Sequence, residues 1–194
     1  MDFKRENLKI TNYCAQIDFQ CNFDLNKIFK TKYKFIQNKK YSPKRFSALC
    51  CKYKDTRISA LIFKNGKINI LGSKTHREIE KFIRVLRKSL IRYKPYKCAK
   101  YKIYNICTSI KLQQKLKLEV IYSFVKSPIC FYEPELFAGM IMTINNSKFT
   151  IHRSGVIFNT GGTDLNIIWE NYEQIFNIIN KSIEQNTNIN NAIN

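Results

Sequence analysis

Cysteine and histidine are the residue types through which this chain could bind a metal ion or supply a nucleophile. Its seven cysteines are an odd number and form no CxxC pair, and only His76 and His152 could add imidazole ligands. A structural zinc site needs four such ligands at short spacing. The chain also shows no Walker loop, dinucleotide fingerprint or Ser/His/Asp arrangement. We therefore expect no metal, no cofactor and no enzymatic activity, and we expect free thiols in a reducing compartment.

Basic side chains give the sequence its strongest chemical bias. The chain has 34 Lys and Arg against 14 Asp and Glu, a formal net charge of +20. Residues 1–100 carry a net charge of +19 and residues 101–194 a net charge of +1. One half should therefore attract a polyanion, which could be nucleic acid, an anionic membrane surface or an acidic protein. Hydrophobic residues make up 44% of the chain, which excludes a disordered basic tail.

Membrane partners fit the sequence poorly. No stretch of 18 uncharged apolar residues occurs, and the opening MDFKRENLKI has no apolar signal core. No amphipathic helix combines a Lys-rich polar face with an exposed apolar one, as a membrane-surface helix would. We expect a soluble intracellular protein that does not bind membranes.

Three short motifs occur twice in the same order, which indicates an internal repeat. The offset between the copies falls from 93 to 91 to 89 residues, so the second copy has lost two residues in each of two loops. The pairs are NYCAQIDF at 12 and NICTSIKL at 105, YSPKRF at 41 and YEPELF at 132, and GKINILG at 66 and GVIFNTG at 155.

Each copy should consist of a strand, a short helix or loop, several antiparallel strands and a long helix. Thr75 and Glu78 fit a capping box at the start of the first long helix. Gly66 and Gly155 stand where hairpin turns are needed. The Asn-rich tail at 185–194 is expected to fray. Helical spacing predicts helices at 74–92 and 163–183, and β-like runs occur at 58–63, 67–71, 138–144 and 156–160.

An antiparallel sheet covered by helices on one face leaves its other face open. Here the open face should carry aromatic and small polar residues rather than charges. The DNA minor groove would suit such a face on a basic protein, because its sugar edges are apolar and apolar side chains can wedge between its base steps.

The segments YSPKRFSAL and ISALIFKNGKINILGSK resemble the first repeat of the TATA-box-binding protein family, and NICTSI with FYEPELFAGMI resembles its second repeat. The resemblance implies an α+β, saddle-shaped tandem-repeat fold: a curved ten-stranded antiparallel sheet with helices on the convex face. It divides the chain into an N-terminal extension (1–8), repeat 1 (9–98), repeat 2 (99–184) and the tail (185–194).

The resemblance also implies a function, that of a transcription initiation factor. Such a protein binds and bends double-stranded promoter DNA through the A·T-rich minor groove. It recruits general initiation factors of the A and B classes and the RNA polymerase machinery. The expected location is the nucleus, or a viral transcription compartment if the source is a large DNA virus.

The family's functional positions carry over to particular residues. Asn12 and Asn105 fit a central pair that donates hydrogen bonds to acceptors in the groove floor. Phe46 and Phe63 fit one wedge pair, and Phe137 fits the first member of a second pair. Further DNA-facing positions are Cys14, Asn69, Leu71, Cys107, Phe158 and Thr160; phosphate-contacting positions are Arg45, Lys52, Lys67 and Lys74; and partner-binding positions are Glu133, Glu135 and Leu136.

Repeat 2 departs from the family pattern. Its second wedge position holds His152, although Phe149 could shift into that role because the strand pair before it is two residues shorter. The repeat-2 counterparts of Lys52, Lys67 and Lys74 are Thr143, Val156 and Thr163. An alternative function is therefore a protein-interaction platform with weak or non-TATA DNA binding.

Overall fold

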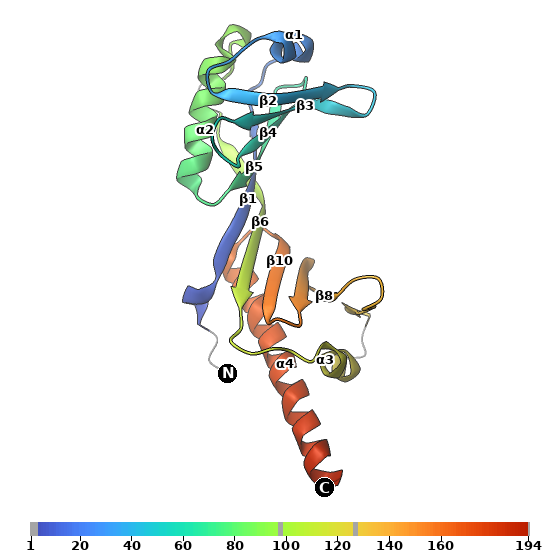
Figure 1. Ribbon diagram of the computed structural model, residues 1–194. Coiled ribbons are helices and arrows are strands. Elements are labelled where there is room, and N and C mark those ends of the chain that lie inside the picture. The colour runs from blue at the N-terminus through green and yellow to red at the C-terminus, as the bar shows by residue number, and fades with distance from the viewer. Residues whose placement is uncertain (1–3, 97–98, 126–127, 194) are drawn as a thin grey trace. The chain divides into compact units, whose positions relative to one another are not determined.

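The computed structural model describes residues 4–96, 99–125 and 128–193 and divides into two compact units (Figure 1). We call residues 11–105 the repeat-1 unit, and residues 1–10 together with 106–194 the repeat-2 unit. No helix in the described part of the chain combines the length and hydrophobicity needed to span a bilayer.

The strands form a ten-stranded antiparallel sheet in the order β2-β3-β4-β5-β1-β6-β10-β9-β8-β7. The helices are α1 (Leu25–Lys30), α2 (His76–Ser89), α3 (Leu118–Val125) and α4 (Leu165–Ile193), with short 3-10 turns at Arg5–Asn7 and Ile91–Tyr93. The strands are β1 (Lys9–Asp18), β2 (Ile36–Ser42), β3 (Phe46–Tyr53), β4 (Ser59–Ile62), β5 (Lys67–Ser73), β6 (Tyr101–Lys111), β7 (Cys130–Phe131), β8 (Gly139–Ile144), β9 (Ser147–His152) and β10 (Val156–Gly162). Strand, short helix, strands and long helix thus recur in each repeat, as predicted.

Helix α2 covers one face of the sheet in the repeat-1 unit (Figure 1). It begins after Thr75, whose hydroxyl accepts a hydrogen bond from the Glu78 N–H at 3.2 Å. The Glu78 carboxylate in turn accepts from the Lys74 N–H at 2.6 Å, so the predicted cap forms. On the buried side of α2, Phe82 stacks on Tyr53 with ring centroids 4.9 Å apart. Helix α2 therefore covers one face of the sheet and leaves the opposite face open to other contacts.

Helix α4 covers one face of the sheet in the repeat-2 unit. It begins after Asp164, whose carboxylate accepts from the Asn166 N–H at 2.7 Å. Ile168, Ile175 and Ile179 are fully buried. The expectation that the tail would fray is wrong for the described residues, because α4 continues to Ile193. The helix α3 packs against α4, and this contact supports a helix longer than the sequence periodicity predicted.

Two glycines make the predicted hairpin turns, and no other residue would fit. Gly66 has φ +88° and Gly155 has φ +84°, the region that side chains rarely adopt. A Cβ at Gly66 would lie 2.4 Å from the Cys21 carbonyl oxygen. At Gly155 it would lie 2.4 Å from the Gln114 carbonyl oxygen. These turns set the register of β5 and β10, on which several candidate residues lie.

The hairpin between β8 and β9 is shorter than its repeat-1 equivalent, as predicted. Ile144 pairs with Ser147, so only Asn145 and Asn146 form the turn, with φ values of 46° and 64°. Asparagine tolerates this left-handed backbone, which two-residue hairpins require. In repeat 1, residues 54–57 form the corresponding loop, because the Tyr53 N–H donates to the Ile58 carbonyl.

The core of the repeat-2 unit is more polar than that of the repeat-1 unit. The Thr108 and Tyr172 hydroxyls lie 3.2 Å apart, and burial raises the pKa of Tyr172 far above its ordinary value. Asn159 and Asn171 are fully buried, and the Asn159 Oδ1 atom has no hydrogen-bond partner. In repeat 1, Ala15 corresponds to Thr108 and Ile83 to Tyr172. Ile70 corresponds to Asn159 and Phe82 to Asn171.

Candidate nucleic-acid interface

Strand alternation places most of the predicted DNA-facing residues on the open face. In β10, Ile157 and Asn159 are buried under α4, and the Tyr172 hydroxyl donates to the Ile157 carbonyl at 3.3 Å. Phe158 and Thr160 therefore lie on the opposite side, where both are exposed. By the same alternation, Lys67, Asn69 and Leu71 in β5 and Cys107 in β6 lie on the open side of their strands.

The two central asparagines both lie against Cys14. The Asn12 Oδ1 atom accepts a hydrogen bond from the Gly72 N–H at 2.7 Å. Because a backbone N–H can only donate, this contact fixes the amide orientation and leaves Nδ2 as the donor group. The Asn12 Nδ2 lies 3.3 Å from the Cys14 sulfur, and the Asn105 Nδ2 lies 3.8 Å from it. Thiol sulfur is a weak acceptor, so a stronger acceptor could replace it as the partner of the Asn12 Nδ2.

This contact also has a consequence for Cys14 itself. Cys14 is only 6% exposed, and both asparagine amides lie against its sulfur. Cys14 therefore supports the asparagines and offers little surface of its own. Gly72, which holds the Asn12 oxygen, has φ +90° and lies at a register shift between β1 and β5. The bulge is what turns its N–H toward the asparagine.

A second amide pair lies beside them on the open face of the repeat-1 unit. The Gln16 Nε2 donates to the Asn69 Oδ1 at 2.8 Å, and the two residues face each other in the register of β1 and β5. The family resemblance predicts a role for Asn69 alone. Gln16 could have been found from the alternation of β1, in which Ala15 and Ile17 are the buried neighbours.

Each unit exposes a pair of rings with nearly the same geometry. Phe46 and Phe63 have centroids 6.3 Å apart and ring planes at 71°. Phe137 and His152 have centroids 6.1 Å apart and planes at 70°. Phe149 instead lies in the core, fully buried against Tyr172 at 5.0 Å. His152, and not Phe149, thus occupies the place that corresponds to Phe63.

Backbone geometry holds the Phe137 ring next to His152. The Glu133 carbonyl accepts from the N–H groups of Leu136 and Phe137, which tightens the turn before β8. Gly139 follows and pairs with His152 in the register of β8 and β9. A Cβ on Gly139 would lie 2.7 Å from a Phe137 ring carbon, so the ring packs directly over the glycine backbone. The turn before β8 thus holds Phe137 beside His152 at the end of β9.

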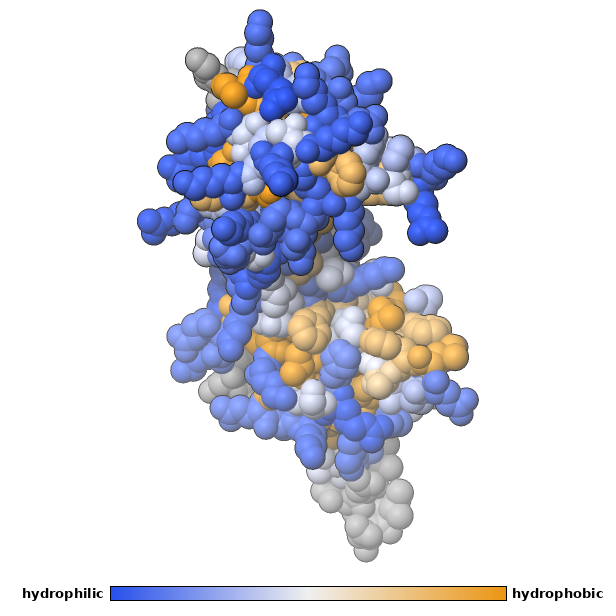
Figure 2. Space-filling view, turned by 45° about the horizontal axis from the view of Figure 1, so that its top comes forward, coloured by the Kyte–Doolittle hydropathy of each residue, from blue (hydrophilic) through white to orange (hydrophobic). Residues whose placement is uncertain are grey.

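Repeat 2 carries a third ring on its open face. His152 contacts Phe158 with centroids 5.8 Å apart at 87°. Phe158 also belongs to a row of directly opposed residues that crosses β10, β9, β8 and β7. The row consists of Phe158, Thr150, Ile141 and Phe131. Figure 2 shows hydrophobic side chains gathered on the unit that holds β8–β10. Phe131 and Ile141 were not predicted, because only the strand register aligns them with the rings.

The predicted phosphate-contacting side chains all lie on the repeat-1 unit. Arg45, Lys52, Lys67 and Lys74 are exposed. The repeat-1 unit has 24 basic and 5 acidic residues, a net charge of +19, and the repeat-2 unit has 10 and 9, a net charge of +1. In Figure 2 hydrophilic side chains dominate the unit that holds β2–β5. A polyanion would therefore be held mainly by the repeat-1 unit.

The predicted partner-binding residues lie in the turn before β8. Glu133 and Glu135 are exposed, and the Leu136 side chain is 79% exposed. Two carboxylates beside an exposed leucine would repel phosphates and suit a basic and apolar protein surface.

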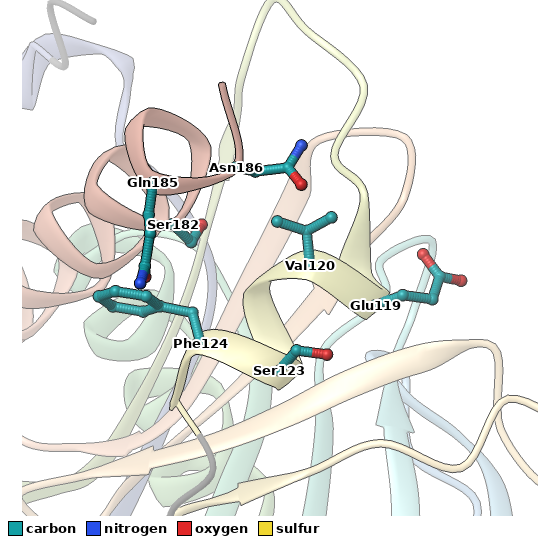
Figure 3. Close-up of a pocket in the computed structure, with 7 residues that line it drawn as sticks. All are labelled: Glu119, Val120, Ser123, Phe124, Ser182, Gln185 and Asn186. Atoms are coloured by element: carbon teal, nitrogen blue, oxygen red, sulfur yellow. The ribbon is translucent and has the colours of Figure 1, made fainter. Parts of the chain in front are cut away.

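The repeat-2 unit also has a pocket of about 330 Å³ between α3 and α4. Glu119, Val120, Ser123 and Phe124 line it from α3, and Ser182, Gln185 and Asn186 line it from α4 (Figure 3). It lies between helices and contains none of the predicted site residues. Among the described residues, no group of three His, Cys, Asp or Glu side chains could hold a metal ion.

Comparison with known proteins matches this chain and its fold to one family. The family model "Transcription factor TFIID (or TATA-binding protein, TBP)" matches residues 7–93 and 100–182. The TATA-box-binding protein of Pyrococcus furiosus is 28% identical over 185 residues, 93% of this chain and 94% of its own. That of Candida albicans is 30% identical over 178 residues, 89% of this chain and 71% of its own.

A solved structure gives the same answer. The structure of Methanococcus jannaschii TBP matches with a TM-score of 0.79 and 25% identity, covering 90% of this chain and 99% of that one. The expected fold class, an α+β tandem repeat with a ten-stranded antiparallel sheet, is confirmed. The family model matches more than half of the chain in two segments, one for each repeat, and the chain belongs to the TATA-binding protein family.

Proposed function

We propose that this chain is a transcription initiation factor that binds and bends promoter DNA through the minor groove. The observation that carries the proposal is the ring pair on the open face of each unit, with interplanar angles of 71° and 70°. In each pair one ring, Phe46 or Phe137, is exposed and the other, Phe63 or His152, is half-buried. Rings at matched positions of a duplicated sheet suit insertion between base steps, where a partly unstacked step kinks the duplex. Family membership supports the same function.

The remaining open-face groups would each have a separate role. The Asn12 and Asn105 amides would donate to the acceptors that A·T and T·A pairs both present in the groove floor. Arg45, Lys52 and Lys67 would neutralise phosphates along the groove edge. The rings would deform the duplex, and the amides would give the preference for A·T pairs. The cations would supply most of the affinity. No step in this mechanism requires a cofactor or a covalent reaction.

Protein partners would bind outside the open face. Glu133, Glu135 and Leu136 form an exposed acidic and apolar turn that suits a basic surface. General initiation factors of the B class would bind there, with those of the A class and the RNA polymerase machinery as further partners. The protein would act where its promoters are transcribed, which in a eukaryotic cell is the nucleus.

A second candidate function is a protein-interaction platform with weak DNA binding. The observation that favours it is the repeat-2 face, where Phe131, Ile141 and Phe158 place aromatic and aliphatic side chains in one row. Exposed apolar patches of this kind also occur at protein interfaces.

Gel-shift titration of an A·T-rich promoter duplex against a G·C-rich duplex of equal length, at one fixed salt concentration, separates the two candidates. A DNA-binding factor should prefer the A·T-rich duplex by at least about tenfold, or about 1.4 kcal/mol. Phe46→Ala with Phe63→Ala should weaken binding to the A·T-rich duplex, because the rings supply the deformation. Phe124→Ala, an exposed phenylalanine on α3, is the matched control and should change nothing. Equal and weak binding to both duplexes would reject the proposal and favour the platform.

A further inference from the structure

Repeat 2 retains one cation at a position that alignment of the two copies does not reveal. Lys52 faces Ser59 in the register of β3 and β4. At the equivalent pair in repeat 2, Thr143 faces Lys148 in the register of β8 and β9. Threonine thus replaces the lysine on one strand, and a lysine replaces serine on the neighbouring strand. The pair has the same composition in both repeats, a hydroxyl and an ammonium, with the two exchanged.

Both lysines lie on the open face of their strands. In β9, Ser147, Phe149 and Ile151 are buried, so Lys148 points to the other side with His152. In β3, Leu49 and Cys51 are buried, so Lys52 also points to the open side. Both lysine side chains are exposed. Lys148 also faces Thr160 of β10, so the residues directly opposite it on either side are threonines and not carboxylates.

The exchange moves the attachment point of the charge by a short distance only. Directly opposed residues of an antiparallel pair have Cβ atoms about 5 Å apart. A lysine carries its ammonium on a flexible four-carbon stem, which can cover that difference. Lys148 lies four residues before His152, and Ser59 lies four residues before Phe63. The ammonium is thus kept at the same distance along the strand from the ring pair, about 13 Å.

We propose that Lys148 is a phosphate-contacting residue of repeat 2 and replaces across the strand pair the charge that Lys52 supplies in repeat 1. The inference rests on the proposed DNA-binding function. It changes the expected distribution of contacts, because one phosphate-facing cation then belongs to the repeat-2 face. Thr143 is the counterpart of Lys52 in the sequence alignment, but Lys148 on the neighbouring strand supplies the charge that Thr143 lacks.

The test is the salt dependence of binding to an A·T-rich duplex, measured for four chains. Removal of a single phosphate-neutralising cation lowers the slope of log affinity on log salt by about 0.9, which is the change expected for Lys148→Ser. Lys148→Ser combined with Thr143→Lys restores the repeat-1 arrangement and should return the slope to the wild-type value. Lys181→Ser removes an exposed lysine from α4 and should leave the slope unchanged. Circular dichroism should be the same for all four chains.

The outcomes separate this inference from the function on which it rests. A salt-dependent wild type whose slope is unaffected by Lys148→Ser overturns the role of Lys148 and leaves the proposed function standing. The same follows if Lys181→Ser lowers the slope as much as Lys148→Ser does. A wild-type chain that binds no duplex at any salt concentration overturns both.

Discussion

The two repeats present the same backbone with opposite surface chemistry. One row of directly opposed residues crosses the open face of each unit, and the rows can be compared position by position. From the edge strand inward, the repeat-1 row is Lys40, Cys50, Leu61, Asn69 and Gln16, and the repeat-2 row is Phe131, Ile141, Thr150, Phe158 and Ser109. Where repeat 1 has the cation Lys40 and the amide Asn69, repeat 2 has the exposed rings of Phe131 and Phe158, and Ser109 takes the place of the amide Gln16.

The turns that precede the ring pairs also differ in charge, because the repeat-1 turn is basic and the repeat-2 turn is acidic. Ser42, Lys44 and Arg45 in repeat 1 correspond to Glu133, Glu135 and Leu136 in repeat 2. Both turns share a hydrogen bond, from the N–H of the third residue of each set to the carbonyl of the first. One backbone therefore carries a cationic turn suited to phosphates and an acidic turn suited to a protein. The two copies of one backbone thus carry different surfaces: repeat 1 carries the basic surface, and repeat 2 carries the apolar and acidic surface.

Reversing the acidic turn should have the largest effect. Changing Glu133 and Glu135 to Arg would place like charges against a basic partner, which costs several kcal/mol. The complex with an initiation factor of the B class should weaken by more than about 100-fold. Binary DNA binding should stay equal or strengthen. Pull-down and gel-shift assays on the same preparation measure both; weakened DNA binding with an indifferent partner would refute the assignment.

Neutralising the repeat-1 lysines should come next in size. Changing Lys52, Lys67 and Lys74 together to Ala removes three phosphate-neutralising cations and should flatten the salt slope by about 2 to 3. Affinity near physiological salt should fall by about 100-fold.

A matched control uses the repeat-2 counterparts. Substituting Thr143, Val156 and Thr163 by Ala should leave the slope unchanged, because none of them carries a charge. If the two triple variants had the same slope, the electrostatic difference between the repeats would play no part in DNA binding.

Exchanging the unlike rings should change the bend more modestly. His152→Phe gives repeat 2 the ring pair of repeat 1, and a larger apolar ring gains more from insertion between bases. The bend should increase. Phe63→His makes the reverse exchange and should reduce it. Energy transfer between dyes at the two ends of a duplex reports the bend. A bend that responds to neither exchange would exclude these two positions as wedges.

The smallest expected effect concerns the core. Asn159 is fully buried with an unpartnered Oδ1 atom, and its repeat-1 counterpart is Ile70. Asn159→Ile should remove the penalty for the unpaired oxygen and stabilise the repeat-2 unit by about 1 kcal/mol. Thermal unfolding should show a midpoint a few degrees higher, with Ile70→Val as a mildly destabilising comparison in repeat 1. A lower midpoint for Asn159→Ile would show that the isoleucine does not fit the site.

Much of this site could be predicted from the sequence because the repeat supplies an internal template. The hairpin glycines follow from matching the copies, and the roles proposed for the central asparagines and Phe137 follow from the family resemblance. Lys148 could not be found in that way, since the role proposed for it depends on which residue faces it across β8 and β9. The burial of Cys14 and the helical tail depend on side-chain and helix contacts that short motifs do not encode.

The most direct test of the division between repeats is the unstacking of each kinked step in the wild-type complex. The fluorescence of 2-aminopurine, placed in turn at either kinked base step of an oriented A·T-rich duplex, reports this unstacking. The step next to Phe46 and Phe63 should brighten strongly, because two phenyl rings insert there. The step next to Phe137 and His152 should brighten less. Equal brightening at both steps would contradict unequal wedging by the repeats, and no brightening at either step would contradict minor-groove insertion altogether.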